Sequence, residues 1–205
     1  MTKLIAINPD NPQPRLINQV AQLLAQGMII CYPTDTGYGI GCDIFNAKAV
    51  RRIVQLKKRP ASKPFSFMCS DLKNISHYAH VSNTAYRLLK KNLPGSYTFI
   101  LPGTKLVPKI MTTRQKTVGI RVPANTICRS LLAAFGAPLV NTSIMDTDDE
   151  ATPHDPNLIE LAIGNQIDLI IDGGEVMPDP SSIIDLTGPS PEIIRVGKGD
   201  VTPFQ

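Results

Sequence analysis

The feature that most constrains this chain is an apolar segment followed by a hydroxyl-rich turn and a series of alternating glycines. Residues 27–32 are largely apolar, and Pro33-Thr34-Asp35-Thr36 follows at once. Gly37, Gly39 and Gly41 then alternate with larger residues. The apolar run predicts a buried strand, and the glycines allow other groups to approach the backbone closely. Their spacing is not that of Gly-x-Gly-x-x-Gly, so it is at most a weak dinucleotide-binding signal.

Hydrophobic periodicity along the chain predicts an α/β fold in a single domain, residues 1–205. With 42% hydrophobic residues, the chain can bury a substantial core. Strands and helices alternate without a regular βαβ repeat, which favours a mixed sheet over a purely parallel one. We expect helices at 16–26, 46–58, 84–92, 126–135 and 158–163, and strands at 28–32, 97–101, 117–122, 138–142, 168–172, 182–186 and 192–196.

Cysteine usage and hydropathy exclude several classes of protein. The four cysteines are widely spaced, with no Cys-x-x-Cys motif and no adjacent histidine, so no metal site is predicted. No apolar run approaches the ~18–20 residues that a membrane span needs, and the N-terminus lacks the features of a signal peptide. We therefore expect a soluble, cytoplasmic protein without a membrane partner. The P-loop motif and Gly-x-Ser-x-Gly are both absent. The sequence does not indicate an oligomeric state.

Charge is distributed very unevenly between the two halves of the chain. Residues 1–116 carry 17 Lys and Arg against 4 Asp and Glu, whereas residues 117–205 carry 4 against 13. One interpretation is that these are solvated faces of opposite sign. The other is that the first half supplies a basic surface or cavity for phosphates or nucleic acid.

Three basic residues, at two places in the chain, are candidates for binding an anion. The apolar stripe of the helix at 46–58 continues at Lys57, which should therefore point inward, and Arg59 precedes a proline. Arg121 lies on a strand, on the face opposite Val118, Ile120 and Val122, where it could offer its planar fork to a carboxylate or phosphate. The alternatives are that Lys57 and Arg59 only interact favourably with the dipole at the C-terminus of the helix, and that Arg121 faces solvent.

Polar residues follow two of the predicted strands. Thr34, Asp35 and Thr36 follow the first, and Thr142 and Ser143 follow the strand at 138–142. Open α/β sheets bind ligands beyond strand ends, where hydroxyls and backbone amides can hold a small zwitterion or phosphate oxygens. Ordinary turn chemistry is the alternative explanation.

A series of short blocks in a fixed order gives the chain a specific resemblance. It resembles the YrdC/YciO family, whose best known members are threonylcarbamoyl-AMP synthases of tRNA modification, over nearly its whole length. The blocks are residues 33–43, 57–64, 94–101, 118–123, 141–143, 172–174, 180–185 and 194–197.

The resemblance implies a twisted, open mixed sheet with helices that encloses a basic concave cavity. It also implies a nucleotidyltransferase reaction in which ATP, L-threonine and bicarbonate give threonylcarbamoyl-AMP and pyrophosphate, with Mg²⁺ carried on the ATP. Residues at the family's functional positions are assigned as follows: Lys57, Arg59 and Ser143 catalytic; Thr36, Arg121 and Thr142 substrate-binding; Lys57, Arg59, Ser182 and Arg195 nucleotide-binding.

One departure from the family pattern points to the YciO branch. Synthases of the family usually carry Ser-x-Asn where this chain has Ser143-Ile144-Met145. Replacing an amide by a thioether removes a hydrogen-bond donor and an acceptor. Two hypotheses follow. The chain is either a synthase-type enzyme whose activity can be weak, or a non-catalytic or altered-substrate relative that binds double-stranded RNA or tRNA through its basic cavity.

Overall fold

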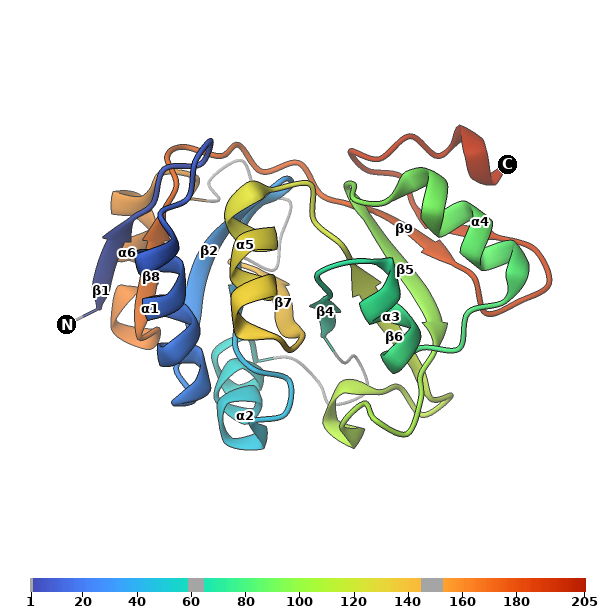
Figure 1. The fold of residues 1–205 in the computed structure, drawn as a ribbon, viewed down its shortest axis with the longest axis horizontal. Helices are drawn as coiled ribbons and strands as arrows, with labels where there is room; N and C mark the ends of the chain where they lie inside the picture. Colours follow the sequence, from blue (N-terminus) through green and yellow to red (C-terminus); the bar gives the residue numbers. More distant parts are fainter. Residues whose placement is uncertain (1, 59–64, 145–152) are drawn as a thin grey trace.

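The computed structural model describes residues 2–58, 65–144 and 153–205, and the predicted single-domain α/β fold with a mixed sheet is confirmed. Within these ranges ten strands form one sheet in the order β1-β8-β2-β3-β7-β4-β6-β5-β9-β10 (Figure 1). The strands are β1 Lys3–Ala6, β2 Ile30–Thr34, β3 Gly37–Gly41, β4 Ser66–Met68, β5 Tyr97–Pro102, β6 Thr117–Arg121, β7 Leu139–Ser143, β8 Leu169–Asp172, β9 Ser182–Asp185 and β10 Glu192–Arg195. The helices are α1 Pro14–Ala25, α2 Ala47–Leu56, α3 Leu72–Tyr78, α4 Asn83–Asn92, α5 Thr126–Phe135 and α6 Pro156–Ile163, with short 3₁₀ turns at Lys109–Met111, Gly164–Gln166 and Thr202–Phe204. No helix in the described ranges is long and apolar enough to cross a membrane.

Side-chain caps fix where several helices begin. Asn46, Ser82 and Asn125 each accept a hydrogen bond from a backbone N–H in the first turn of α2, α4 and α5. These bonds satisfy donors that a helix start otherwise leaves unpaired. Gly136 ends α5 with a φ of 75°, a left-handed conformation that favours glycine.

The glycine-rich segment after the turn is a strand, β3, which sequence reasoning did not predict. It pairs with β2 as an antiparallel hairpin in which Tyr32 faces Gly39. A side chain at Gly41 would meet the Val140 carbonyl oxygen at 2.1 Å and the Tyr32 ring at 2.9 Å. The hydroxyl of Tyr32 lies 2.9 Å from that same carbonyl oxygen. The glycines therefore make room for a buried tyrosine and a close neighbouring strand.

Helices cover the two faces of the sheet differently. We call the face that carries Tyr32, Asn141 and Arg121 the inner face. The helices α1 and α5 lie beside each other against its β2 side, where Tyr32 packs with Leu24 and Leu131 (Figure 1). The opposite, outer face packs against α2, α3, α4 and α6 in a second hydrophobic cluster.

The sheet curls over its inner face. In the β3–β7 register Gly39 faces Ser143, which puts Thr36 beyond the end of β7. Arg121 pairs with Met68 of β4, and Met68 pairs with Leu139 at the start of β7. Arg121 is therefore level with the opposite end of β7. In a flat sheet Thr36 and Arg121 would be more than about 20 Å apart, given about 3.3 Å per residue and about 4.8 Å per strand. Their side chains nevertheless meet at 2.9 Å, so twist has brought the β2–β3 turn and the C-terminal end of β6 together.

Candidate functional site

The meeting point of the β2–β3 turn and the C-terminal end of β6 is built around Arg121. Its Nη1 donates to Thr36 Oγ1 at 2.9 Å, and its Nη2 donates to Asp35 Oδ1, also at 2.9 Å. The other oxygen of Asp35 accepts a hydrogen bond from Ser96 Oγ at 2.8 Å. The side chains of Arg121 and Asp35 are only 5% and 8% exposed. Arg121 is therefore in a buried ion pair, not in solvent. We call Asp35, Thr36, Ser96 and Arg121 the closed corner.

The chemistry of the groups at the closed corner determines which atoms donate and which accept. A guanidinium only donates, so Thr36 Oγ1 accepts from Arg121. Thr34 Oγ1 lies 3.1 Å from Thr36 Oγ1 and donates to the Gly37 carbonyl oxygen at 2.6 Å. The hydroxyl proton of Thr36 is therefore available to Thr34 or to a ligand. One lone pair of Thr36 Oγ1 also remains for a ligand donor.

Arg121 has one donor that the closed corner does not use. Within the described residues its Nε is buried and has no acceptor. A buried donor without a partner costs free energy, and such groups often mark a ligand or water position. The arginine is thus fixed by two bonds, and its Nε–H remains available to a ligand.

A second set of polar residues lies on the side of β5 opposite β6, around Arg195 and Ser181. Arg195 donates through Nε and Nη2 to the Ser181 carbonyl oxygen, at 2.9 and 2.7 Å. The Ser181 hydroxyl lies 2.9 Å from Thr98 Oγ1, and both residues are buried. Ser182 N donates to the Ser96 carbonyl oxygen, which connects this group to the closed corner. The Ser182 hydroxyl itself is buried; it accepts from Gly197 N and donates to the Gly199 carbonyl oxygen, both in the C-terminal segment.

Lys57 points inward, as the apolar stripe of its helix predicted. It is 6% exposed, and its Nζ donates to the Ile144 carbonyl oxygen at 2.9 Å, just after β7. The ammonium is thus fixed at the end of the strand that carries Ser143. The predicted phosphate contact Arg59 and the departure at Met145 both lie outside the described residues.

The two predicted residues of β7 point to different faces of the sheet. Ser143 pairs with Gly39 on the inner face and is exposed, whereas Thr142 pairs with Ile40, faces the outer side and is buried. Strand register places small or polar residues side by side along the inner face of β3, β7, β4, β6 and β5. They are Gly39, Ser66, Thr98, Gly119, Asn141 and Ser143. None of these belongs to either hydrophobic cluster.

Covalent chemistry through cysteine is not supported at this site. All four thiols are buried, and burial raises their pKa values; that of Cys42 is raised to about 12. They stay protonated at neutral pH and are poor nucleophiles. The described ranges hold no cluster of three or more His, Cys, Asp or Glu side chains that could bind a metal ion.

Sequence reasoning missed several residues at the site. Asp35 was expected as part of a polar turn, not as the partner of Arg121. Ser96 and Ser181 were not singled out, nor was Lys198, whose Nζ donates to the Asp35 carbonyl oxygen at 2.7 Å. Ser96 and Ser181 do lie inside the short blocks that carry the family resemblance, and Lys198 stands between two glycines.

Known proteins share the fold of this chain and identify its family. A family model for Sua5, YciO and YrdC proteins, described as telomere recombination, matches residues 22–197. The chain belongs to the Sua5/YciO/YrdC family.

Individual relatives agree with this assignment. YciO of Escherichia coli K12 is 46% identical over 205 residues, with both chains fully covered, and its crystal structure superposes with a TM-score of 0.94. A threonylcarbamoyl-AMP synthase of Coxiella burnetii is 33% identical over 158 residues, 77% of this chain and 84% of that protein. Pyrococcus abyssi Sua5, crystallised with L-threonine, has a TM-score of 0.87 at 29% identity, covering 96% of this chain and 58% of that one.

Proposed function

We propose that this protein is a nucleotidyltransferase that makes L-threonylcarbamoyladenylate from ATP, L-threonine and bicarbonate, with release of pyrophosphate, for tRNA modification. The synthase named in Coxiella burnetii and the L-threonine complex of Sua5 support this substrate set. The observation that carries the proposal is the closed corner, where a guanidinium and a carboxylate are held side by side with a threonine hydroxyl.

The closed corner has the chemistry that an amino acid requires. The fork of Arg121 suits a carboxylate or carbamate, and its Nε still lacks an acceptor in the described structure. Thr36 offers a hydroxyl that can both donate and accept. On the inner face beside Arg121, Ser66 and Gly119 are partly exposed and Ser143 is exposed, so a ligand can approach the strands there. An amino acid at Arg121 would thus place its amino group beside a nucleotide bound on the same face.

The reaction needs alignment more than it needs a protein nucleophile. Threonine nitrogen and bicarbonate condense to a carbamate with loss of water. A carbamate oxygen then attacks the α-phosphorus, and the bond to the β-phosphate breaks as pyrophosphate leaves. Lys57 and Arg195 would neutralise charge that develops on the phosphates, and magnesium would enter with ATP as part of the substrate.

A steady-state assay tests this proposal. With MgATP, L-threonine and bicarbonate, the purified protein should release pyrophosphate at a rate that falls to background when threonine is omitted. Arg121→Met should abolish this dependence, whereas Arg129→Met, which removes an exposed arginine of α5, should not. Circular dichroism should confirm that both variants are folded. Release that is independent of threonine would contradict the proposal.

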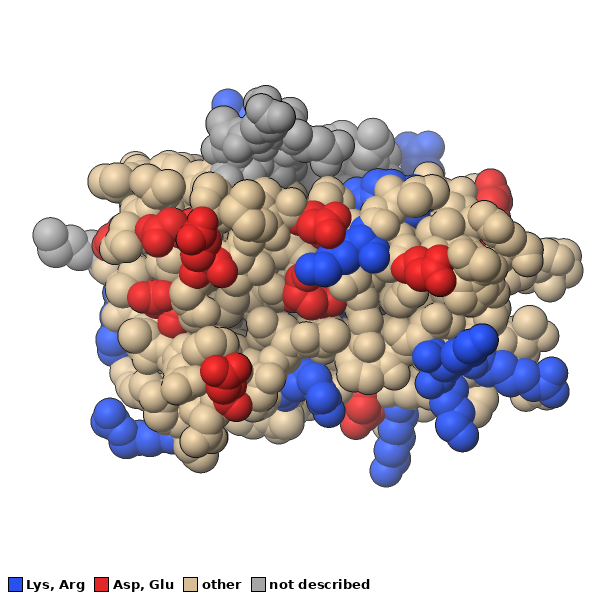
Figure 2. All heavy atoms as spheres, turned by 90° about the horizontal axis from the view of Figure 1, so that it is seen from above, with Lys and Arg blue, Asp and Glu red and all other residues tan. Residues whose placement is uncertain are grey.

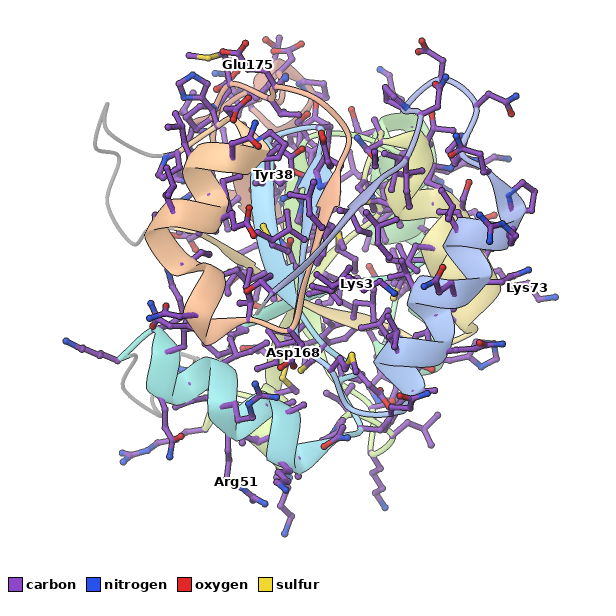
Figure 3. The ribbon with its side chains drawn as sticks, turned by 90° about the vertical axis from the view of Figure 1, so that its left-hand side faces the viewer. Lys3, Tyr38, Arg51, Lys73, Asp168 and Glu175 are labelled. Carbon is purple, nitrogen blue, oxygen red and sulfur yellow. The ribbon has the colours of Figure 1, made fainter. Side chains whose placement is uncertain are left out.

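Exposed cations favour a second candidate function, the binding of double-stranded RNA or tRNA. Lys48 and Arg51 lie on the exposed side of α2, and the exposed Lys58 follows the helix. Arg51 extends away from the protein in Figure 3. Residues 72–144 contain no Asp or Glu. On the face seen in Figure 2, by contrast, basic and acidic side chains lie next to each other near the centre. This proposal therefore assigns RNA to the outer surface of α2.

Salt dependence tests the RNA proposal. The affinity for a duplex RNA should fall steeply as salt rises, because phosphate contacts release counterions. Arg51→Gln should weaken binding and reduce the slope, while Lys73→Gln on α3 serves as the charge-matched control. An affinity that does not respond to salt would rule this surface out.

A further inference from the structure

The loop between β10 and the C-terminal 3₁₀ turn presents one lysine from a tightly packed backbone. A side chain at Gly197 would meet the Pro180 carbonyl oxygen at 2.2 Å, and one at Gly199 would meet the Tyr97 ring at 2.4 Å. Lys198, between these glycines, is exposed and extends its side chain out of the loop. The loop thus fixes the point from which this ammonium reaches out.

The side chain of Lys198 crosses to the turn between β2 and β3. Its Nζ donates to the Asp35 carbonyl oxygen at 2.7 Å. That oxygen belongs to the peptide group that joins Asp35 to Thr36, whose hydroxyl accepts from Arg121. The ammonium and the guanidinium therefore flank the same turn. Lys198 is exposed, so a ligand at the closed corner can reach it.

The ammonium is not required to hold its own loop. Lys198 N donates to the Pro180 carbonyl oxygen at 2.8 Å. The buried Ser182 hydroxyl accepts from Gly197 N at 2.9 Å and donates to the Gly199 carbonyl oxygen at 2.6 Å. An exposed bond from Nζ to a neutral carbonyl adds little to this arrangement. An ammonium has three donors, so two remain for a ligand.

The charges at the turn leave room for an anion. The carboxylate of Asp35 balances Arg121 within the buried pair, which leaves the charge of Lys198 uncompensated by that pair. Asp179 is joined to the turn through its backbone N–H, which donates to the Thr36 carbonyl oxygen, and its exposed side chain can offset part of this charge. The spare donors of Lys198 and the unused Nε of Arg121 both belong to this corner.

We propose that Lys198 is a further anion-binding residue of the site, which donates to a carboxylate or phosphate oxygen of a ligand held at the closed corner. The inference rests on the proposed function, because it takes its ligands from that reaction. The shared chemistry is an oxyanion, and its two sources are the carboxylate of L-threonine and the phosphates of ATP.

Equilibrium binding to the full-length protein, measured separately for L-threonine and for MgATP, tests this assignment. Lys198→Met keeps the aliphatic stem and removes the charge. It should weaken one of the two ligands about ten-fold, the scale of a hydrogen bond to a charged group. Lys198→Arg should restore much of the loss. Lys105→Met, an exposed lysine beyond the far end of β5, should bind both ligands like wild type. The ligand whose affinity falls in Lys198→Met identifies the source of the oxyanion.

Two results would overturn the inference, and they differ in what else they affect. If wild type binds threonine or MgATP and Lys198→Met binds both within two-fold of it, Lys198 is not a ligand-binding residue and the proposed function stands. If wild type binds neither ligand, the proposed function fails and this inference fails with it. An unchanged urea midpoint in Lys198→Met shows that any loss of affinity is local.

Discussion

Removing the carboxylate of Asp35 should destabilise the fold far more than removing its charge alone. In Asp35→Ala, Arg121 Nη2 and Ser96 Oγ both lose their partner, and the guanidinium stays buried without a counter-ion. Breaking a buried pair by deleting one partner costs about 3–5 kcal/mol. We expect a loss in that range.

Asp35→Asn separates the charge from the hydrogen bonds. The amide oxygen can still accept from Arg121, and the amide nitrogen can donate to Ser96 Oγ, which reverses that bond. The geometry of the closed corner is then retained and only the ionic part is lost. We expect about 1–2 kcal/mol, near the difference between a charged and a neutral hydrogen bond.

Urea denaturation at neutral pH gives both free energies from the transition midpoints, provided that the slope is unchanged. The control is Asp179→Ala, which removes an exposed carboxylate next to the same turn. A loss below about 1 kcal/mol in Asp35→Ala, or equal losses in the Ala and Asn variants, would refute the view that this pair holds the turn and the end of β6 together.

Three further predictions concern the scaffold. Gly41→Ala puts a methyl group against a β7 carbonyl oxygen and should lower the free energy of unfolding by about 3 kcal/mol or more. Gly136→Ala meets open space and should lower it by about 1 kcal/mol, because of the left-handed φ at that position. Thermal unfolding compares the two variants. Ser182→Ala leaves Gly197 N and the Gly199 carbonyl oxygen without their buried partner and should cost about 1–3 kcal/mol, with faster proteolysis of the C-terminal segment as its signature. Burial would raise the pKa of Asp168, but hydrogen bonds from Arg52 and a backbone N–H outweigh it and lower that pKa. The pair's contribution is therefore present above the unfolded pKa of about 4 and lost as pH falls through the folded value. The stability gap between wild type and Asp168→Asn should close in acid, and a gap independent of pH would contradict this.

Patterns that act locally were predictable from the sequence. The caps Asn46 and Ser82 and the terminating Gly136 set helix ends within one or two residues, because each satisfies backbone groups of its own helix. The inward orientation of Lys57 followed from helical spacing for the same reason. The family resemblance added the order of the polar blocks along the chain.

Features that depend on distant contacts were not predictable. β3 was missed because glycine is a poor strand residue, and only the ring of Tyr32 and the β7 backbone explain why glycine is required there. The partner of Arg121 was missed because Asp35 is 86 residues away and belongs to the turn between β2 and β3. No periodicity encodes the curl that joins them. The strands β1 and β4 were also missed; β4 is only 3 residues long, too short to show an alternating pattern.

The most direct test of the central claim is to identify the product. The protein should be incubated with MgATP, L-threonine and isotopically labelled bicarbonate, and the mixture analysed by mass spectrometry. We expect threonylcarbamoyl-AMP that carries the label, formed by wild type and lost in Arg121→Met. An adenylate without the label, or no adenylate from the folded wild-type protein, would contradict it.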